Sequence, residues 1–416
     1  MKGKRIARIW VSLLLLFAIS LSVCGCTAPS SQELSDGVTP NTVTASDDLS
    51  QGNAAVTDFA VRLLQGSNES GKNTLVSPLS VLCALSMSAN GADGETRAEM
   101  ERVLGMTTEQ LNQYVYTYQS ALPQSESAKL SLANSIWSTD DARFTVDRDF
   151  LQINADYYGA DVFQVPFDAP TVERMNGWVD EHTDGMIPKI VDELPTDTVM
   201  CLINALAFDA EWTTPYSEDQ VRKGTFTRQD GTVQDAELMH SEEWYFLEDE
   251  DATGFIKHYR GRGYAFVALL PNEGVDLADY VASLDGASLR ELLTHPISTT
   301  VYAAMPKFES TYDVELSGVL AEMGMPLAFE PADADFSRLG RYEGKNIYIS
   351  SILHKTVISV GEKGTKAGAV TMVVDSPDDA PMDPKRVTLD RPFLYMLIDC
   401  ENSVPFFIGT VTELER

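Results

Sequence analysis

The amino-acid sequence predicts an α+β fold. Helical patterns dominate the first part of the chain, whereas strand-like apolar runs dominate the later part. The two kinds of element do not alternate strictly, which argues against a doubly wound parallel sheet. No period of about 20–50 residues repeats, so a solenoid or a propeller is not expected. An apolar content of 44% is sufficient for a large core.

The N-terminus carries a targeting segment, residues 1–26. A positively charged region that includes Lys2 and Arg8 precedes an apolar run over 9–23, which is short for a transmembrane helix. The sequence Val23-Cys24-Gly25-Cys26 resembles a bacterial lipobox, which implies a lipid on Cys26 after cleavage. The alternative is plain secretion after cleavage nearby, beyond Ala28. Either outcome predicts an extracellular protein.

A flexible tether is expected over residues 27–50, which are rich in Ser, Thr, Asp and Pro and poor in large apolar side chains. The folded domain is expected over residues 51–416, because no interior stretch has the composition of a linker.

The folded domain is predicted to begin with helices. Val56, Phe59 and Leu63 recur on one helical face. Ser77-Pro78 is a helix start, since Ser caps free amides and Pro fits the first turn; this helix should end near Gly91. A further helix is expected over 95–104, with Gly105 as its stop.

Strand-like runs follow. Leu130, Leu132 and Ile136 alternate with more polar residues, and apolar runs recur at 199–209, 264–270, 300–305, 348–360 and 392–400. Two runs, 392–400 and 405–411, are joined by residues 401–404 and predict a C-terminal hairpin.

The charge and the cysteines limit the function classes. The formal charge of −31 predicts an acidic surface that repels phosphate backbones, so nucleic acid is not an expected partner. Outside the targeting segment, Cys83, Cys201 and Cys400 each lie in an apolar segment, and none has a CxxC partner. Small buried thiols are therefore expected rather than disulfides or a metal site.

No enzyme motif is found in the sequence. The five histidines belong to no HExxH motif, and the sequence has neither a GxSxG nor a Walker loop. The acidic run over 242–251 lacks the spacing of an EF-hand and is interpreted as a solvated loop. The protein is therefore not expected to be an enzyme, and no cofactor or metal is expected.

The stretch over 362–384 combines two incompatible patterns. Residues 365–374 have the alternation of a buried strand, with small or β-branched side chains sharing one face. The following residues, 375–384, contain four Asp and three Pro, which is typical of an exposed loop. A strand-competent segment that leads into an exposed loop could lie in solvent or in a sheet.

The residues around this stretch resemble the serpin family over roughly 52–412. The hinge of an inhibitory serpin's reactive loop is similar to Glu362, Gly364, Thr365, Ala367, Gly368 and Ala369. Family strands are similar to 353–355, 390–393 and 406–409, and the middle of the chain matches around 198–205, Trp212 and 306–308. The resemblance implies the serpin fold, with about eight or nine helices packed around three β-sheets and an exposed reactive loop at about 362–388.

The resemblance also implies roles for individual residues. Ser77, Ser80, Asn204 and His354 would meet beneath the central sheet, where its strands part, and Trp212 would lie near the top of that sheet. Lys307 and Glu362 would form an ion pair that holds the top of the loop. A static core network is the alternative interpretation of the Ser, Asn and His cluster.

The implied function is inhibition of a serine protease as a suicide substrate, with the cleaved loop inserting into the central sheet. Family spacing from Glu362 puts the scissile bond at Asp378-Asp379, which requires a protease with a basic pocket. Bonds after Val374 or Met382 are alternatives that suit an elastase-like or subtilisin-like protease. We expect a monomer that meets a membrane only through its lipid. The alternative function is a non-inhibitory serpin-fold binding module on the cell surface.

Overall fold

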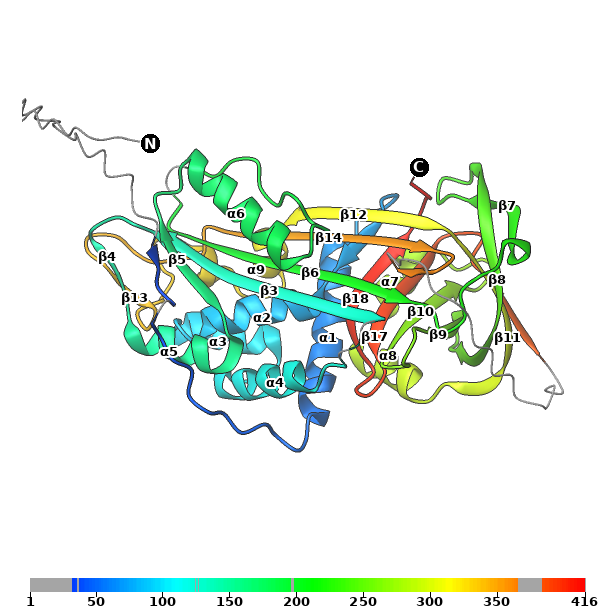
Figure 1. Cartoon of the computed structure of the whole chain (residues 1–416), viewed down its shortest axis with the longest axis horizontal. Helices are drawn as coiled ribbons and strands as arrows, with labels where there is room; N and C mark the ends of the chain where they lie inside the picture. The colour runs from blue at the N-terminus through cyan, green and yellow to red at the C-terminus, as the bar shows by residue number, and fades with distance from the viewer. Residues whose placement is uncertain are drawn as a thin grey trace, which may run out of the picture. The chain divides into compact units, whose positions relative to one another are not determined.

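The computed structural model of the protein describes residues 32–35, 37–123, 125, 127–195, 198–365 and 384–415. This described part contains nine α-helices and three β-sheets, so the predicted α+β class is confirmed, and both numbers agree with those that the family resemblance implies (Figure 1). The helices are α1 Ser50–Ser67, α2 Pro78–Ala89, α3 Gly94–Leu104, α4 Thr108–Ala121, α5 Arg148–Tyr158, α6 Ala169–His182, α7 Leu277–Ser283, α8 Gly286–Thr294 and α9 Ser317–Glu322. Two short 3-10 helices are η1 Glu218–Gln220 and η2 Pro326–Phe329.

The first sheet has seven strands. Their spatial order is β1 Gln32–Glu33, β5 Asp161–Val165, β3 Ala128–Thr139, β6 Met200–Glu211, β15 Gly364–Thr365, β14 Ser351–Gly361 and β12 Phe308–Glu315. We call it the central sheet, because helices cover both of its faces.

The second sheet has nine strands. Along its main path they are β16 Lys385–Thr388, β11 Ile297–Pro306, β8 Val233–Glu248, β9 Ala252–His258, β10 Tyr264–Pro271, β17 Phe393–Asp399, β18 Val404–Val411 and β2 Thr74–Val76, while β7 Val221–Thr227 pairs with β8. The third sheet pairs β13 Gly340–Tyr342 with β4 Phe144–Val146. The C-terminal hairpin that the sequence predicts is formed by β17 and β18.

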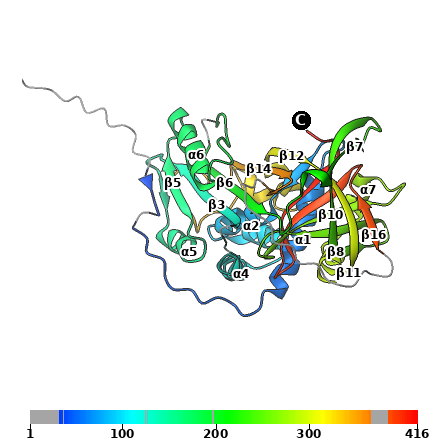
Figure 2. The same cartoon turned by 45° about the vertical axis from the view of Figure 1, so that its right-hand side comes forward.

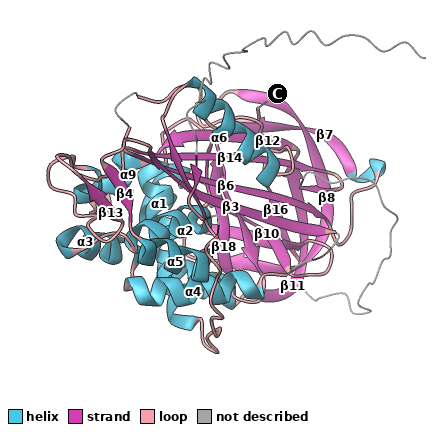
Figure 3. Cartoon of the chain, turned by 60° about the vertical axis from the view of Figure 1, so that its left-hand side comes forward, coloured by secondary structure: helices cyan, strands magenta, loops and turns pink. Residues whose placement is uncertain are grey.

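The two faces of the central sheet have different covers. Figures 1 and 3 show most helices on one face of the sheet and α6 on the other. Along β6 the even-numbered Leu202, Leu206 and Phe208 belong to the main core, whereas the odd-numbered residues Cys201 and Ile203 belong to a second apolar cluster that contains residues of α6. This alternation is the one expected of a strand buried on both sides.

Helix ends follow the local signals in the sequence. The Ser77 side chain accepts a hydrogen bond from the Ser80 backbone amide and caps α2, whose first residue is Pro78. All twelve residues of α2 are buried, so this helix crosses the interior of the domain. Helix α3 ends at Leu104, and Gly105 has the left-handed conformation (φ 74°) that stops it.

The segment before α1 differs from the expected flexible tether. Strand β1 pairs antiparallel with β5, and the Leu34 amide donates to the carbonyl of Val162 at 2.7 Å. Further along, the Asn41 amide donates to the Asp156 carboxylate at 2.7 Å. Composition alone did not reveal this docking, because short polar segments can be held by backbone pairing and by capping carboxylates without burying large apolar groups. Residues 1–31, with Cys26, lie outside the described residues.

The three cysteines of the domain are free thiols in the structure. Cys83 and Cys201 are buried, and Cys400 is half-buried. Within the described ranges, no helix is both long enough and apolar enough to cross a membrane, and no group of three or more His, Cys, Asp or Glu side chains is arranged to hold a metal ion.

Candidate functional site

The central sheet has two parallel strands that part at one end. Residues 351–355 of β14 pair directly with residues 201–205 of β6. Towards their C-terminal ends the two strands separate, and the two residues of β15 lie between them. Thr365 pairs with Ala210 on one side and Val360 on the other, both antiparallel. The site is therefore an opening in the sheet whose mouth holds the first residues after Lys363.

Gly364 fits this opening because it has no side chain. Its φ is +154°, and a Cβ atom there would lie 2.0 Å from the carbonyl oxygen of Ala210. No real Cβ contact is that short, so any other residue would push β15 away from β6. The glycine thus permits the close backbone approach that strand pairing requires.

Thr365 is the first of the predicted hinge residues whose side chain points inward. It is 1% exposed, and its hydroxyl is 2.6 Å from the hydroxyl of Tyr259. The Tyr259 ring is stacked on Trp212, with ring centroids 4.3 Å apart. Burial raises the pKa of Tyr259 far above its ordinary value, so the phenol stays neutral and available for this hydrogen bond.

Two residues after β6 hold the backbone of the turn that enters β15. The Trp212 amide donates to the carbonyl of Lys363, and its indole Nε1 donates to the carbonyl of Gly361, both at 2.8 Å. The Tyr216 amide donates to the carbonyl of Glu362 at 2.8 Å. Three consecutive carbonyls are therefore bound, which fixes the point where the hinge begins. Trp212 was expected here, whereas Tyr216 was missed because no short motif marks it.

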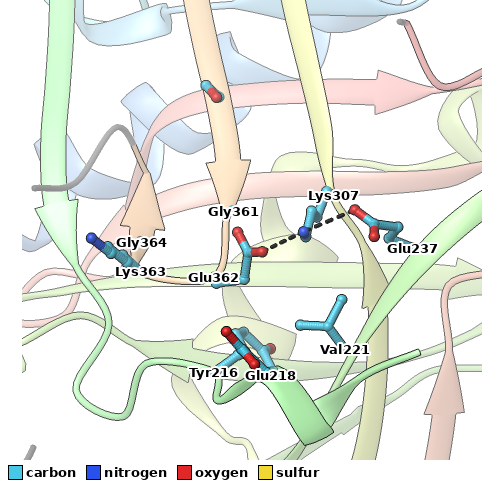
Figure 4. Close-up of a pocket in the computed structure, with 10 residues that line it drawn as sticks. Tyr216, Glu218, Val221, Glu237, Lys307, Gly361, Glu362, Lys363 and Gly364 are labelled. Carbon is cyan, nitrogen blue, oxygen red and sulfur yellow. Dashed lines mark hydrogen bonds and ion pairs between the residues drawn. The ribbon is translucent and has the colours of Figure 1, made fainter. Parts of the chain in front are cut away.

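The expected ion pair between Lys307 and Glu362 is present (Figure 4). The Lys307 Nζ also contacts Glu237 at 2.9 Å, a partner that the sequence did not indicate because β8 is far from β12 in the chain. Burial opposes the charge of Lys307, but hydrogen bonds to Glu362 and Glu237 outweigh it and raise the pKa of the lysine. The hydrogen bond from Lys307 lowers the pKa of Glu362. Lys363 points away from Lys307 in Figure 4.

The site lies beside a cavity of about 890 Å³, part of which Figure 4 shows. Glu237, Lys307 and Glu362 line this cavity together with the turn residues Lys363 and Gly364. Because both carboxylates are more than one-third exposed, the ion pairs are screened by water and contribute only ~0–1 kcal/mol each. The triad orients the turn rather than locking it.

A buried polar cluster lies beneath the closed part of the sheet. The Ser77 amide donates to His354 Nε2 at 3.1 Å, and the Ser80 amide donates to the Ser77 hydroxyl at 3.3 Å. His354 is fully buried, which lowers its pKa to about 3, so its ring is neutral and can accept this bond. The strand register puts Asn204 opposite His354. The four residues expected to meet are therefore on adjacent segments at the start of the opening.

The remaining predicted site residues are outside the part of the chain that the structure describes. These are the hinge residues Ala367, Gly368 and Ala369, the scissile residues Asp378 and Asp379, and the alternatives Val374 and Met382.

The fold is a central sheet with an opening between β6 and β14, and this opening holds the two residues of β15. A sequence model of the serpin (serine protease inhibitor) family matches residues 54–414. The chain therefore belongs to the serpin family, whose members are generally inhibitors of serine proteases.

Several relatives match most of the chain. The structure of the thermophilic serpin tengpin in its native state has a TM-score of 0.88 and 44% identity, covering 92% of this chain and all of that chain. Tengpin in its latent state has a TM-score of 0.80 and 42% identity, covering 89% of this chain and all of that one. A serpin-like protein of Thermococcus kodakarensis is 30% identical, over 92% of this chain and 91% of its own length. The plasma serine protease inhibitor of Bos taurus is 28% identical, over 82% and 85% respectively.

Proposed function

We propose that this protein is a suicide-substrate inhibitor that traps a serine protease as an acyl-enzyme. The observation that carries the proposal is the position of β15, which begins an antiparallel strand between two parallel strands that are otherwise paired. The closer match to native than to latent tengpin supports the interpretation of this structure as the form before insertion.

The register of β15 sets where the rest of the hinge would go. Thr365 pairs with Ala210, so in a continued strand Ala367 would face Phe208 and Ala369 would face Leu206. Both partners belong to the main core, so small side chains suit these positions.

The opposite face suits the alternate hinge residues. In the same register Lys366 would face Asp209, so its positive charge would meet a carboxylate. Val374 would reach Cys201, the first residue of β6 that pairs with β14. Asp375 would then lie beside Met200, the first residue of β6, on the same face as Thr365.

Insertion would gain backbone hydrogen bonds. The parallel ladder between β6 and β14 covers five residue pairs, and insertion would replace it with two antiparallel ladders along the new strand. Antiparallel pairing is slightly more stable per residue than parallel pairing. The cut loop would also bury its small apolar side chains. The antiparallel backbone pairing and the burial of small apolar side chains both favour the inserted state once cleavage frees the loop.

The inhibitory step follows from the distance moved. The protease nucleophile attacks the loop and forms an ester with the residue before the scissile bond. With cleavage at Asp378-Asp379, fourteen residues from Thr365 enter the sheet and carry the protease roughly 45 Å at ~3.3 Å each. Pressed against the inhibitor, the protease loses the oxyanion geometry needed for deacylation. Insertion of the reactive loop is the strand addition and the release of stored strain for which serpins are already known.

The target is an elastase-like or subtilisin-like serine protease, the inhibitor acts as a monomer, and it is either secreted or held at the cell surface by a lipid on Cys26. The polar cluster of Ser77, Ser80, Asn204 and His354 exchanges partners as the strand enters, since a buried network must stay satisfied.

The test mixes the purified domain, residues 32–416, with a panel of serine proteases and separates the products on denaturing gels. We expect a band at the summed mass that survives boiling, together with a released C-terminal fragment. Sequencing that fragment identifies the scissile bond among those after Val374, Asp378 and Met382. If every protease only cuts the loop or leaves it intact, the inhibitor proposal is wrong and a binding module on a serpin fold replaces it.

A further inference from the structure

A second cavity lies beside the hinge, on the far side of Tyr216. Its volume is about 880 Å³, within the range of sites that hold small organic ligands. Its walls come from the turn after β6 and from strands β7, β8, β9, β11 and β16, several of which lie together at one end of the molecule's larger sheet (Figure 2). We call it the arginine pocket, after the residues Arg222, Arg262 and Arg386 that line it.

The arginine pocket is positively charged in a strongly acidic protein. Its lining contains four positive side chains, the three arginines and Lys257, and two negative ones, Glu242 and Glu243. Lys257 and Glu243 are paired at 2.8 Å and buried, so they neutralise each other. The pocket therefore has a net charge of +2 with its histidines neutral, whereas the whole chain has −31.

None of the three guanidinium groups forms a salt bridge with a carboxylate among the described residues. Arg222 makes a long contact of 3.5 Å from Nε to the Asp219 carbonyl, and Arg386 lies over the ring of Tyr302 at 5.6 Å. Hydrogen bonds from Ser217 and the backbone lower the pKa of Asp219, and the charge of Arg222 adds to this shift. Elsewhere in the same chain arginines do find acids, as in the pair of Arg260 with Glu211 at 2.9 Å. The chain contains 62 acidic residues against 31 Lys and Arg, yet the fold leaves these three groups facing the cavity.

The arginines help to lower the pKa values of two histidines in the same pocket. Burial lowers the pKa of His240, and the charges of Arg222 and Arg386 lower it further. Burial lowers the pKa of His258 as well, with Arg262 as the next cause. Each arginine thus acts on a neighbour inside the pocket. The three arginines are exposed to solvent, so this net positive charge lies at an open surface pocket, where it attracts anions.

The shape of the lining suits an anion with an organic body. The side chains of Tyr302 and Trp244 supply aromatic surface beside the arginines. Guanidinium groups bind phosphate, sulfate or carboxylate through paired N–H donors, which a lysine cannot do.

The floor of the pocket is connected to the hinge. Glu243 accepts hydrogen bonds from Lys257 at 2.8 Å and from the Ser241 hydroxyl at 2.7 Å, and Ser241 contacts the Tyr216 hydroxyl at 3.2 Å. The Lys257 ammonium lies 4.4 Å from the centre of the Tyr216 ring. Because the amide of Tyr216 binds Glu362, a change in the pocket reaches the residue that begins the hinge through one side chain.

We propose that the arginine pocket binds a small oligoanion, bearing phosphate, sulfate or carboxylate groups, between Arg222, Arg262 and Arg386. Its occupancy changes the rate at which the hinge inserts. The effect on insertion rests on the proposed inhibitory function, whereas the binding of the anion does not.

Binding is tested by calorimetric titration of the purified domain with inorganic pyrophosphate and, separately, with citrate, at constant ionic strength. We expect saturable binding of one anion per chain by at least one of the two, and the preferred probe distinguishes phosphate from carboxylate chemistry. The double variant R222Q/R386Q should bind at least tenfold more weakly. The matched control R148Q/R341Q removes the same charge from exposed arginines outside the pocket and should bind like the wild type.

Three results would overturn the binding proposal: no saturable heat with either probe, unchanged binding by the pocket variant, or an equal loss in the control. Each is measured without a protease, so it is independent of inhibition. The coupling is tested by the rate of covalent complex formation with and without the bound probe. We expect a change of at least twofold in the wild type and none in R222Q/R386Q; an unchanged wild-type rate at saturation contradicts the coupling alone.

Discussion

The substitution Thr365→Arg tests the hinge most directly. Thr365 is 1% exposed, and its side chain lies against Tyr259 between two strands. A guanidinium placed there has no carboxylate partner, and burying an unpaired charge costs several kcal/mol even after relaxation. Because Thr365 is already buried in this form, an arginine there would leave the sheet before cleavage and would have to be buried during insertion. If about 3 kcal/mol of that cost enters the barrier to insertion, the insertion rate falls by roughly 100-fold.

The variant should still be recognised and cut by the protease, but it should no longer trap the protease. Insertion competes with deacylation, so the variant should be cut at the same bond and released as a substrate. The assay measures the fraction of protease in the boiling-resistant complex and the number of inhibitor molecules consumed per protease. We expect the complex to be almost absent and the consumption to rise by up to the same factor of about 100.

Two variants control for other effects. Lys363→Arg puts a guanidinium two residues earlier, at an exposed position, and should still form the complex. Thr365→Ser keeps the hydroxyl and its small size and should also inhibit. Circular dichroism should show a folded Thr365→Arg protein. A Thr365→Arg variant that forms the complex at the wild-type rate would refute the assignment of the hinge and of its register.

Three further predictions concern the same opening. His354→Gln should remove one source of pH-dependent stability. Because burial lowers the pKa of His354 to about 3, the unfolded wild type binds one more proton than the folded protein below about pH 6.5. The free energy of unfolding of the wild type, measured by urea unfolding, should therefore decrease by about 1.4 kcal/mol per pH unit as the pH falls from about 6.5 towards about 3. Glu362→Gln should lower stability by ~0–1 kcal/mol at pH 7 and by less as the pH falls through the lowered pKa of Glu362, since protonation also breaks its pair with Lys307. Gly364→Ala should expel β15, because its Cβ would meet the Ala210 carbonyl, and limited proteolysis should then cut the hinge sooner.

For these variants, each contrary outcome has a clear meaning. An unchanged pH slope in His354→Gln would show that this histidine is not the group that resists protonation. Equal stability differences for Glu362→Gln at neutral and acid pH would exclude the ion pair as their source. Unaltered proteolysis of Gly364→Ala would mean that β15 tolerates a side chain and is not held by close backbone contact.

Local signals in the sequence predicted part of this structure. Ser77-Pro78 predicted the start of α2, and Gly105 predicted the stop of α3, because capping depends on residues that are neighbours in the chain. The C-terminal hairpin was predicted for the same reason. The partners of the site could be expected only from the family resemblance, as for Lys307 with Glu362.

The missed residues share one physical property. Tyr216, Glu237 and Tyr259 act on the hinge from segments more than one hundred residues away, and an isolated tyrosine or glutamate carries no motif. Their roles depend on the sheet register, which only the folded chain defines. The pairing of β1 with β5 was also missed, because backbone pairing of a polar segment does not depend on its amino-acid composition.

The buried helix α2 and the C-terminal hairpin constrain the order in which this protein can be made. Helix α2 is synthesised early but is buried on all sides, and it packs against β18, which lies more than three hundred residues later in the chain. Strand β2, just before α2, also pairs with β18. The core therefore stays open until β18 has left the ribosome, since its closing contacts span more than three hundred residues. If the protein is exported, as we propose, this delay leaves the chain unfolded while it is threaded through a membrane.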